Sequence, residues 1–212
     1  GDAIPSEGEL AARFNVSQGT VRKAIDEMAA ENLLIRRQGK GTFVASHDDP
    51  RSFYRFLRLV PDDGNAAQAV SVPLSCSTKN ADAEVAAALG LKLGDPVIYI
   101  ERLLRFNGET VVFDQIHLVS DLFAGLTLES LSGGDRSLYS LFENDYGVRM
   151  IHAEEHLRAV AADPYRAGLL AVQSGSPLLL VERTAYTYGN KPVEWRRGLY
   201  CTNRHYYRND LG

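Results

Sequence analysis

The chain has 212 residues, 45% hydrophobic and 24% charged, and its formal net charge of −4 excludes a protein coated with nucleic acid but leaves a local nucleic-acid contact open. It has no apolar run near the roughly 18 residues of a membrane-spanning helix and no signal peptide, and its two cysteines, Cys76 and Cys201, have neither metal-ligand nor disulfide-framework spacing. We therefore expect a globular protein of one or two domains in a reduced, cytoplasmic compartment, with no membrane partner and no cofactor.

The first predicted element is a short helix that begins near Glu7. Ser6 and Glu9 have the spacing of a capping box, in which each side chain bonds the backbone N–H of the other residue. The pair Asn15-Val16 ends this helix. Its apolar face consists of Leu10, Ala11 and Phe14.

A second helix is predicted after Ser17, which is a good N-cap residue. Four apolar residues recur with helical spacing and predict its buried face: Val21, Ala24, Ile25 and Met28. The opposite face carries polar and small residues at its N-terminal end: Gln18, Gly19, Arg22 and Lys23. A recognition helix contacts base edges with this end, where the helix dipole also favours phosphate.

A hairpin with a basic tip is predicted next. Gly39 and Gly41 allow a tight backbone around Lys40, which can then approach a phosphate or the minor groove. Helix, turn, helix and hairpin in this order predict a winged helix-turn-helix. The residues expected to contact DNA are Ser6, Ser17, Gln18, Gly19, Thr20, Arg22, Lys23, Gly39, Lys40 and Gly41.

These motifs resemble the N-terminal domain of GntR-type bacterial regulators, which reads approximately L-P-S-E-x-x-L-A, V-S-x-x-T-V-R-x-A and R-x-G-x-G-T-F-V. The resemblance implies a further helix before Gly1, without which part of the core would be missing. Relatives often carry arginine where this chain has Gly8 and usually where it has Gln18. Arginine favours guanine whereas glutamine favours adenine, so an altered or weaker operator is expected.

A polar stretch around Pro50 is typical of a linker, and the rest of the chain contains a repeat. Residues 94–102 and 175–183 share the phrase G-x-P followed by four apolar residues and E-R, at an offset of 81. The same offset relates Asp82 to Asp163, each at the start of a short helix, and Gly108 to Gly189, each at a hairpin turn. The predicted unit of strand, helix, strand, hairpin and strand occurs twice, which indicates an antiparallel sheet backed by helices.

This second half resembles the UTRA effector-binding domain of the HutC branch of GntR regulators, which has the chorismate lyase fold. The predicted fold class is therefore α+β, with a winged helix-turn-helix joined to a chorismate-lyase-like antiparallel sheet domain that contains an internal duplication. We expect a DNA-binding domain at residues 1–46, a linker at 47–66 and an effector-binding and dimerisation domain at 67–212.

Several residues are candidates for the effector site. Arg102 lies on an apolar strand face, so it either pairs with a buried carboxylate or reaches an anion. Ser137 and Tyr139, at the start of a predicted helix that ends at Gly147, either hold an anion or act as an N-cap and a packing residue. Glu194 either accepts from a ligand or pairs with Arg183 or Arg196.

Relatives that bind sugar phosphates have residues matching Arg102, Ser137, Tyr139, Glu194 and Tyr200. They have a second arginine where this chain has Leu104, and Arg-Gly-Asp where it has Cys201-Thr202-Asn203. The resemblance thus implies a carboxylate or phosphorylated metabolite, and these departures favour a smaller or singly charged carboxylate.

Other functions are less well supported by the sequence. His152, Glu154 and His156 alternate on one strand face, where they spread over about 13 Å and make a poor metal site. We expect a homodimeric transcriptional regulator, specifically a repressor, that binds an operator and a small anionic metabolite. The alternatives are a chorismate-lyase-like enzyme and a DNA-binding protein whose second domain only dimerises.

Overall fold

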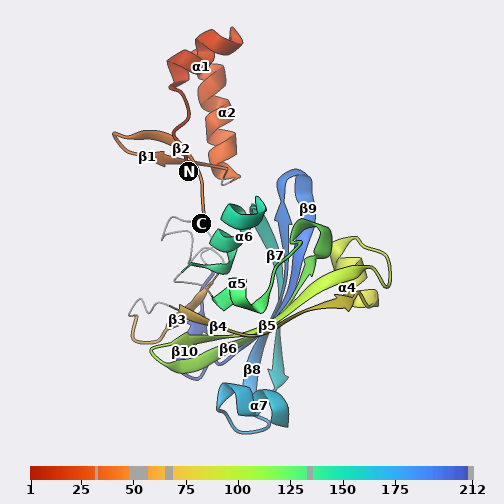
Figure 1. Ribbon diagram of the computed structural model, residues 1–212. Coiled ribbons are helices and arrows are strands. Elements are labelled where there is room, and N and C mark those ends of the chain that lie inside the picture. Colours follow the sequence, from red (N-terminus) through yellow and green to blue (C-terminus); the bar gives the residue numbers. More distant parts are fainter. Residues whose placement is uncertain (32, 48–56, 65–68, 133–135, 210–212) are drawn as a thin grey trace.

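The computed structural model describes residues 1–31, 33–47, 57–64, 69–132 and 136–209. Figure 1 shows a small head of two helices and a hairpin at one end of the chain and a larger domain built on one twisted sheet. Among the described residues, no helix is long and apolar enough to cross a membrane. The predicted α+β class is confirmed.

The head begins with helices α1 (Glu7–Phe14) and α2 (Gln18–Ala30). Both halves of the predicted capping box are present, because Ser6 N–H donates to Glu9 Oε2 at 2.8 Å and Glu9 N–H donates to Ser6 Oγ at 3.3 Å. Asn15 ends α1 in the left-handed conformation. Strands β1 (Leu34–Arg37) and β2 (Gly41–Val44) then pair antiparallel to form the wing.

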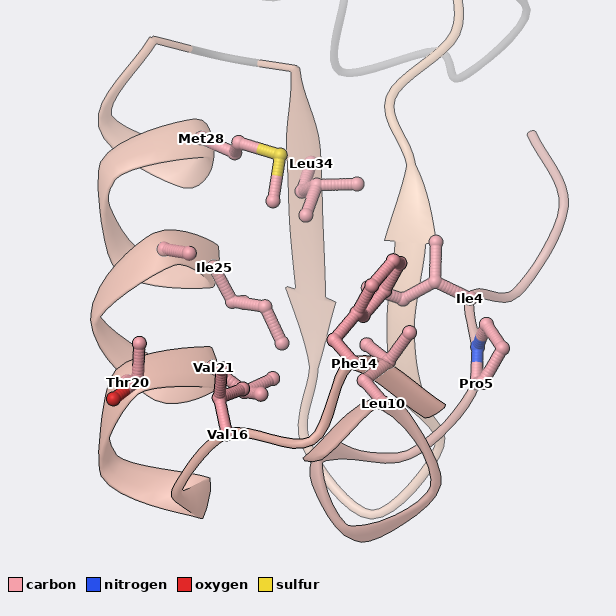
Figure 2. Close-up of a pocket in the computed structure, with 11 residues that line it drawn as sticks. Ile4, Pro5, Leu10, Phe14, Val16, Thr20, Val21, Ile25, Met28 and Leu34 are labelled. Carbon is pink, nitrogen blue, oxygen red and sulfur yellow. The ribbon is translucent and has the colours of Figure 1, made fainter. Parts of the chain in front are cut away.

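The head contains an open apolar groove with a volume of about 350 Å³, shown in Figure 2. Its floor is the buried cluster that holds the two helices and the wing together, with Val21, Ile25 and Leu34 at its centre. The rim includes Phe14, which is 62% exposed, and Val16, which is 42% exposed. The core of the head is therefore open to one side.

The larger domain is built on a six-stranded antiparallel sheet with the order β4-β5-β6-β9-β8-β7. These strands span Ala69–Asn80 (β4), Pro96–Phe106 (β5), Glu109–Val119 (β6), His152–Ala161 (β7), Pro177–Thr187 (β8) and Lys191–Tyr200 (β9). A separate two-stranded ladder joins β3 (Leu59–Pro61) to β10 (His205–Tyr207). Strand β3 thus forms inside the range expected to be a linker.

Helices cover both faces of this sheet. Helices α5 and α6 pack on the face of the sheet that carries Ile98, Ile100 and Arg102. The buried residues of α4 and α7 pack against the opposite face. Their bounds are Ala83–Leu89 (α4), Leu128–Ser132 (α5), Leu138–Tyr146 (α6) and Pro164–Leu170 (α7). Two short 3₁₀ turns span Ser120–Leu122 (η1) and Tyr188–Asn190 (η2). As predicted, Gly147 ends α6.

The order strand, helix, strand, strand occurs twice, as β4-α4-β5-β6 and β7-α7-β8-β9. Asp82 and Asp163 cap the corresponding helices by accepting from the N–H of Val85 and Arg166. Corresponding backbone bonds also repeat, since Gly94 N–H donates to Ala81 O at 2.8 Å and Gly175 N–H to Ala162 O at 2.7 Å. The two halves share architecture, and their origin by duplication stays a prediction.

Candidate functional site

The N-terminal end of α2 is an exposed polar surface. Ser17 caps the helix by accepting from Thr20 N–H at 3.1 Å, while Val21 and Ile25 bury the opposite face. Ten side chains or glycines predicted to contact DNA are exposed here and on the wing: Ser6, Ser17, Gln18, Gly19, Thr20, Arg22, Lys23, Gly39, Lys40 and Gly41. This surface is available to a ligand, and the individual DNA contacts stay a prediction.

Arg22 is held by an acidic partner that sequence reasoning did not identify. Its Nε and Nη2 donate to Glu7 Oε2 at 3.0 and 2.8 Å, and Arg36 Nη2 lies 3.6 Å from Glu7 Oε1. The hydrogen bond from Arg22 lowers the pKa of Glu7, which therefore stays ionised. Glu7 fixes the direction of Arg22 across the gap between α1 and α2.

The two positions at which the head departs from the GntR pattern are neighbours in space. Gln18 Nε2 lies 3.5 Å from the point where a Cβ atom on Gly8 would stand. Because residue 8 is glycine, the side chain of Gln18 has room over the first turn of α1. The two departures therefore alter one patch of the head surface.

The wing tip presents Lys40 on a tight turn. Gly39 and Gly41 have φ angles of +71° and +105°, and Lys40 N–H donates to Arg37 O at 2.9 Å. The guanidinium of Arg37 stacks over the ring of Phe43, 4.7 Å from the ring centroid, so the Arg37 side chain lies against the hairpin. Lys40 is left as the exposed cation at the tip.

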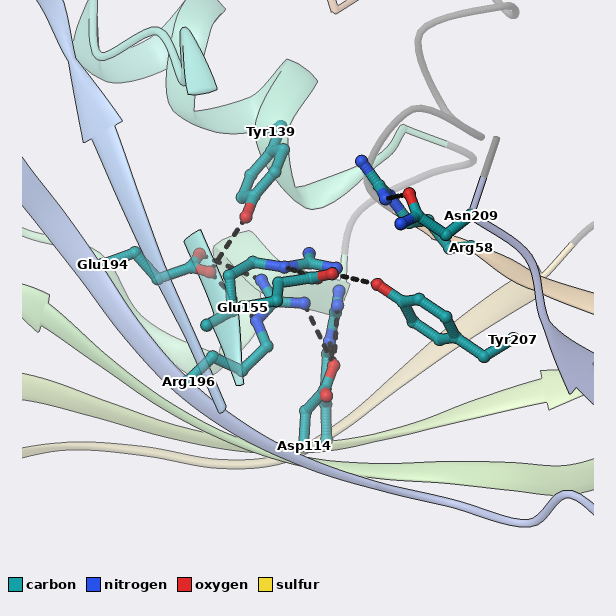
Figure 3. A network of polar contacts seen from close by, with 10 residues as sticks. Arg58, Asp114, Tyr139, Glu155, Glu194, Arg196, Tyr207 and Asn209 are labelled. Atoms are coloured by element: carbon teal, nitrogen blue, oxygen red, sulfur yellow. Dashed lines mark hydrogen bonds and ion pairs between the residues drawn. The ribbon is translucent and has the colours of Figure 1, made fainter. Parts of the chain in front are cut away.

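In the sheet domain, a cluster of buried charges crosses the centre of the sheet, shown in Figure 3. Arg102 on β5 faces Asp114 on β6, and its Nε and Nη2 donate to Asp114 Oδ2 at 2.9 and 2.8 Å. Arg196 Nη1 on β9 donates to the same oxygen at 3.2 Å. Arg102 thus pairs with a buried carboxylate, which is one of the two alternatives considered for it, while its binding of an effector stays a prediction.

Glu194 links this cluster to helix α6. It accepts from Arg196 Nε at 3.0 Å and Nη2 at 2.9 Å, and from the Tyr139 hydroxyl at 2.9 Å. Glu194 is fully buried and Tyr139 is 7% exposed. The pairing of Glu194 with Arg196, one of the two partners considered from the sequence, is therefore present.

A third ion pair adjoins the cluster. Arg183 on β8 lies opposite Arg196 and donates from Nε to Glu155 Oε1 at 2.7 Å, and the Tyr207 hydroxyl donates to the other oxygen of Glu155. Arg183 is 2% exposed. The cluster of buried charges, as used below, comprises Arg102, Asp114, Glu155, Arg183, Glu194 and Arg196.

Three guanidinium groups face three carboxylates in this cluster, so its charge is balanced. Burying ions costs free energy unless each is paired and hydrogen-bonded, and here only one oxygen departs from that rule. Asp114 Oδ1 has no hydrogen-bond partner among the described residues, although Asp114 is fully buried. It is an unused acceptor at the centre of the sheet.

The tyrosines beside the cluster are protonated at neutral pH. Burial, reinforced by the charge of Glu194, raises the pKa of Tyr139 to about 12, and burial raises the pKa of Tyr200 to about 12 as well. Burial opposes the charge of Arg196, but Glu194 and Asp114 outweigh it and raise the pKa of Arg196. The cluster therefore offers phenol and guanidinium donors together with one free carboxylate oxygen.

The predicted effector residues are only partly brought together. Arg102, Tyr139 and Glu194 belong to one connected set of bonds, and the charges of Arg183 and Asp114 act on Tyr200. Ser137 lies at the start of α6, where its hydroxyl accepts from Ser140 N–H at 3.1 Å as an N-cap. Asp114 and Glu155 were not among the residues predicted for this site.

Comparison with known families explains this combination of head and sheet domain. Residues 1–44 match the family of bacterial regulatory proteins called gntR, and residues 68–206 match the UTRA domain. A transcriptional regulator of Mycobacterium tuberculosis, Rv0792c, is 33% identical over 92% of this chain and 72% of its own length. The transcriptional repressor PhnF of Mycolicibacterium smegmatis is 28% identical over 96% of this chain and 82% of its own length.

Solved structures of GntR-family regulators resemble this chain as well. The ligand-binding domain of a protein from Bordetella bronchiseptica, assigned to the GntR-family regulators, is 49% identical and superposes with a TM-score of 0.73 over 75% of this chain and 99% of that chain. The crystal structure of PhnF from Mycobacterium smegmatis is 25% identical, with a TM-score of 0.62 over 100% of this chain and 92% of that chain. Because these relatives are transcriptional regulators, the lyase alternative is set aside. This chain belongs to the GntR family of DNA-binding transcriptional regulators, with a UTRA effector-binding domain of the HutC type.

Proposed function

We propose that the protein is a homodimeric repressor whose affinity for its operator is set by a small, singly charged carboxylate. The carboxylate binds beside Arg102, Ser137, Tyr139, Glu194 and Tyr200, and the head reads DNA with the exposed end of α2 and the wing tip. The observation that carries this proposal is the charge-balanced cluster with one unused carboxylate oxygen. The relative PhnF is named a transcriptional repressor, which supports the proposal that this protein represses transcription.

Because the cluster is already balanced in charge, it favours a ligand with a single negative charge over one with two. Each guanidinium already faces a carboxylate, so a phosphate dianion would add two uncompensated charges to a buried site. Leu104 stands on the same face as Arg102 and supplies no further cation. A single carboxylate can exchange with Asp114 or Glu194 on the guanidinium groups at a much smaller electrostatic cost.

Asp114 Oδ1 argues for a second feature of the ligand. A buried acceptor without a partner costs free energy, which a hydroxyl or ammonium group on the ligand would recover by donating to it. The ligand class that fits both features is a hydroxy acid or an amino acid. Its effect on DNA requires different affinities for the operator-competent and released arrangements of the dimer.

The proposed division of labour follows the expected boundaries, with DNA contact at residues 1–46, a connection at 47–66, and effector binding and dimerisation at 67–212. The ladder of β3 and β10 attaches part of the connection to the sheet domain. This supports a connection in which the part around β3 moves together with the sheet domain, which is called the sensor below.

The test begins with selection of a duplex from random DNA by the full chain. Calorimetry then compares three matched probes: glycolate, glycine and phosphoglycolate, followed by larger hydroxy and amino acids. We expect at least one hydroxy or amino acid to bind and to change affinity for the selected duplex about fivefold or more. Asp114→Leu, which removes the unused acceptor together with the carboxylate that pairs with Arg102 and Arg196, is expected to abolish this binding. Asp121→Leu on the exposed turn η1 is the matched control, and thermal unfolding of both variants shows whether the loss reflects binding or folding.

Two results would contradict parts of the proposal. Binding of phosphorylated compounds alone would overturn the ligand class, and binding of no compound would favour a second domain that only dimerises.

A further inference from the structure

The stretch that leaves the wing is buried, and its last described residue, His47, contacts the sheet domain. Ala45, Ser46 and His47 follow β2 directly and are 5%, 9% and 7% exposed. Ala45 N–H donates to Leu33 O at 3.0 Å, which ties the start of this stretch to the head. In Figure 1 the chain runs from β2 toward α6. A connection between two domains is normally solvated, so burial here needs a specific cause.

His47 provides that cause through three contacts with the sheet domain. Its backbone N–H donates to Glu143 Oε2 at 2.7 Å, and its Nε2 lies 3.0 Å from Met150 O. Since a carbonyl oxygen only accepts, Nε2 carries a proton and donates. The imidazole also lies 5.4 Å from the ring of Tyr139, between ring centroids, with the planes tilted by 57°.

Two of these contacts are made to one helix that also touches the cluster of buried charges. Tyr139 and Glu143 are four residues apart on α6 and so share a face of the helix. The Tyr139 hydroxyl donates to Glu194 Oε1 at 2.9 Å. An uninterrupted series of contacts therefore leads from the wing through His47 and Tyr139 to Glu194.

We propose that His47 is a positioning residue that couples the cluster to the DNA-reading head. This inference rests on the proposed function, because it names the route by which that site acts. A ligand that competes for Glu194 changes the partner of Tyr139, shifts α6, and displaces the contacts that hold His47 against Tyr139, Glu143 and Met150. The orientation of the wing relative to the sensor then changes with occupancy.

The test needs no knowledge of the natural ligand. Tyr139→Phe removes the hydrogen bond to Glu194 and serves as the probe that perturbs the sensor. Affinity for the selected duplex is measured for the unaltered chain, Tyr139→Phe, His47→Ala and the double variant, as a double-mutant cycle. We expect Tyr139→Phe to change affinity about fivefold or more when His47 is present, and less than about twofold when residue 47 is alanine.

Three further variants separate coupling from general damage. His47→Gln keeps a side-chain N–H donor and is expected to restore most of the response to Tyr139→Phe. Glu143→Ala breaks the same contact from the other side and is expected to reduce the response as His47→Ala does. His156→Ala, on the exposed edge strand β7, is the matched control and is expected to leave the response intact.

Amide hydrogen exchange gives an independent readout in the full chain. The amide of His47 is expected to be protected in the unaltered chain and to lose protection in Glu143→Ala, because its acceptor is gone. An equal response to Tyr139→Phe with and without His47, or no response in either, would overturn the inference. Failure of the unaltered chain to select any duplex would instead contradict the proposed function.

Discussion

Arg22 shows how a charged side chain can be kept ready for a ligand by a partner within the protein. The side chain is 62% exposed at the end of α2, yet Glu7 on α1 accepts two of its hydrogen bonds. An exposed ion pair of this kind adds little to stability. Its value lies in direction, because a guanidinium held in one orientation loses less conformational freedom when it binds a base or a phosphate.

Arg22→Ala is expected to weaken binding to the selected duplex about tenfold or more, because it removes the direct contact with DNA that we propose for this residue. Ligand affinity and thermal stability are expected to stay unchanged. Fluorescence anisotropy with labelled duplex and calorimetry with the ligand measure the two effects. Arg105→Ala, an exposed arginine of the sheet domain, is the matched control. Equal loss of DNA and ligand binding in Arg22→Ala would contradict separate sites.

His117 predicts a pH-dependent contribution to stability. Burial between Tyr99 and Trp195 lowers its pKa from 6.5 to about 4. Between these values the unfolded chain binds a proton that the folded chain does not, so the free energy of unfolding falls as pH falls from about 6.5 to about 4. A shift of this size corresponds to about 3 kcal/mol for a fully buried group, and because His117 is only partly buried, solvent screening reduces the loss to the order of 2 kcal/mol.

Urea denaturation at pH 7 and pH 4.5 measures this effect. The pH-dependent loss is expected to be smaller in His117→Gln, whose side chain does not titrate, and unchanged in the exposed control His156→Gln. Identical pH dependence in His117→Gln and the unaltered chain would show that His117 is not the group responsible.

The junction of β6 and β9 is the element on which the cluster depends. Gly198 on β9 lies opposite Asp114 on β6, and a Cβ atom at position 198 would stand 2.8 Å from Asp114 Oδ1 and 2.5 Å from Tyr200 Cε1. The backbone of Gly198 is not in the left-handed region, so space rather than conformation requires glycine here. The unused oxygen of Asp114 and the ring of Tyr200 occupy the space that a side chain would fill.

Gly198→Ala is expected to lower the free energy of unfolding by about 1–3 kcal/mol, since the added methyl group must displace Tyr200 or Asp114. Gly168→Ala in α7 is the matched control, because a Cβ atom there meets nothing within 4 Å and alanine favours helix. Chemical denaturation compares the two variants. A Gly198→Ala protein as stable as Gly168→Ala would show that the junction has room to spare.

The sequence predicted the elements whose signals are local. Capping by Ser6 and Ser17, the helix ends at Asn15 and Gly147, and the repeated helix start at Asp82 depend on a few neighbouring residues, and the structure confirms them. The sequence also identified Arg102 as a charge that needs a partner. Local signals of this kind need no knowledge of strand pairing.

The partner of Arg102 could not be identified, because it depends on a strand irregularity. In a regular hairpin, the turn at Asn107-Gly108 would place Phe113 opposite Arg102, because Arg102 lies five residues before Asn107 and Phe113 lies five residues after Gly108. A register shift between Leu104 and Arg105 moves Asp114 into that position instead. Likewise, the pairing of Arg183 with Glu155 depends on the register of β7 on β8, which no turn between them fixes.

At the scale of the whole molecule, the proposed homodimer predicts the symmetry of the operator. Two heads related by a two-fold axis place two recognition helices on half-sites separated by about one DNA turn or a multiple of it. Selection from random DNA is therefore expected to return pseudo-palindromic sequences, and light scattering is expected to give twice the chain mass of 23.4 kDa. A monomer mass together with asymmetric selected sites would contradict the homodimer.

The strand order β4-β5-β6-β9-β8-β7 also bears on how the protein folds. The neighbouring strands within each half lie close in sequence, whereas the pairing of β6 with β9, like that of β3 with β10, joins distant segments and is therefore entropically slow. Arg102 and Asp114 belong to the first half, and Glu194 and Arg196 to the second. We expect docking of the halves to be a late folding event, so a nascent chain acquires its sensor only when the whole sheet closes.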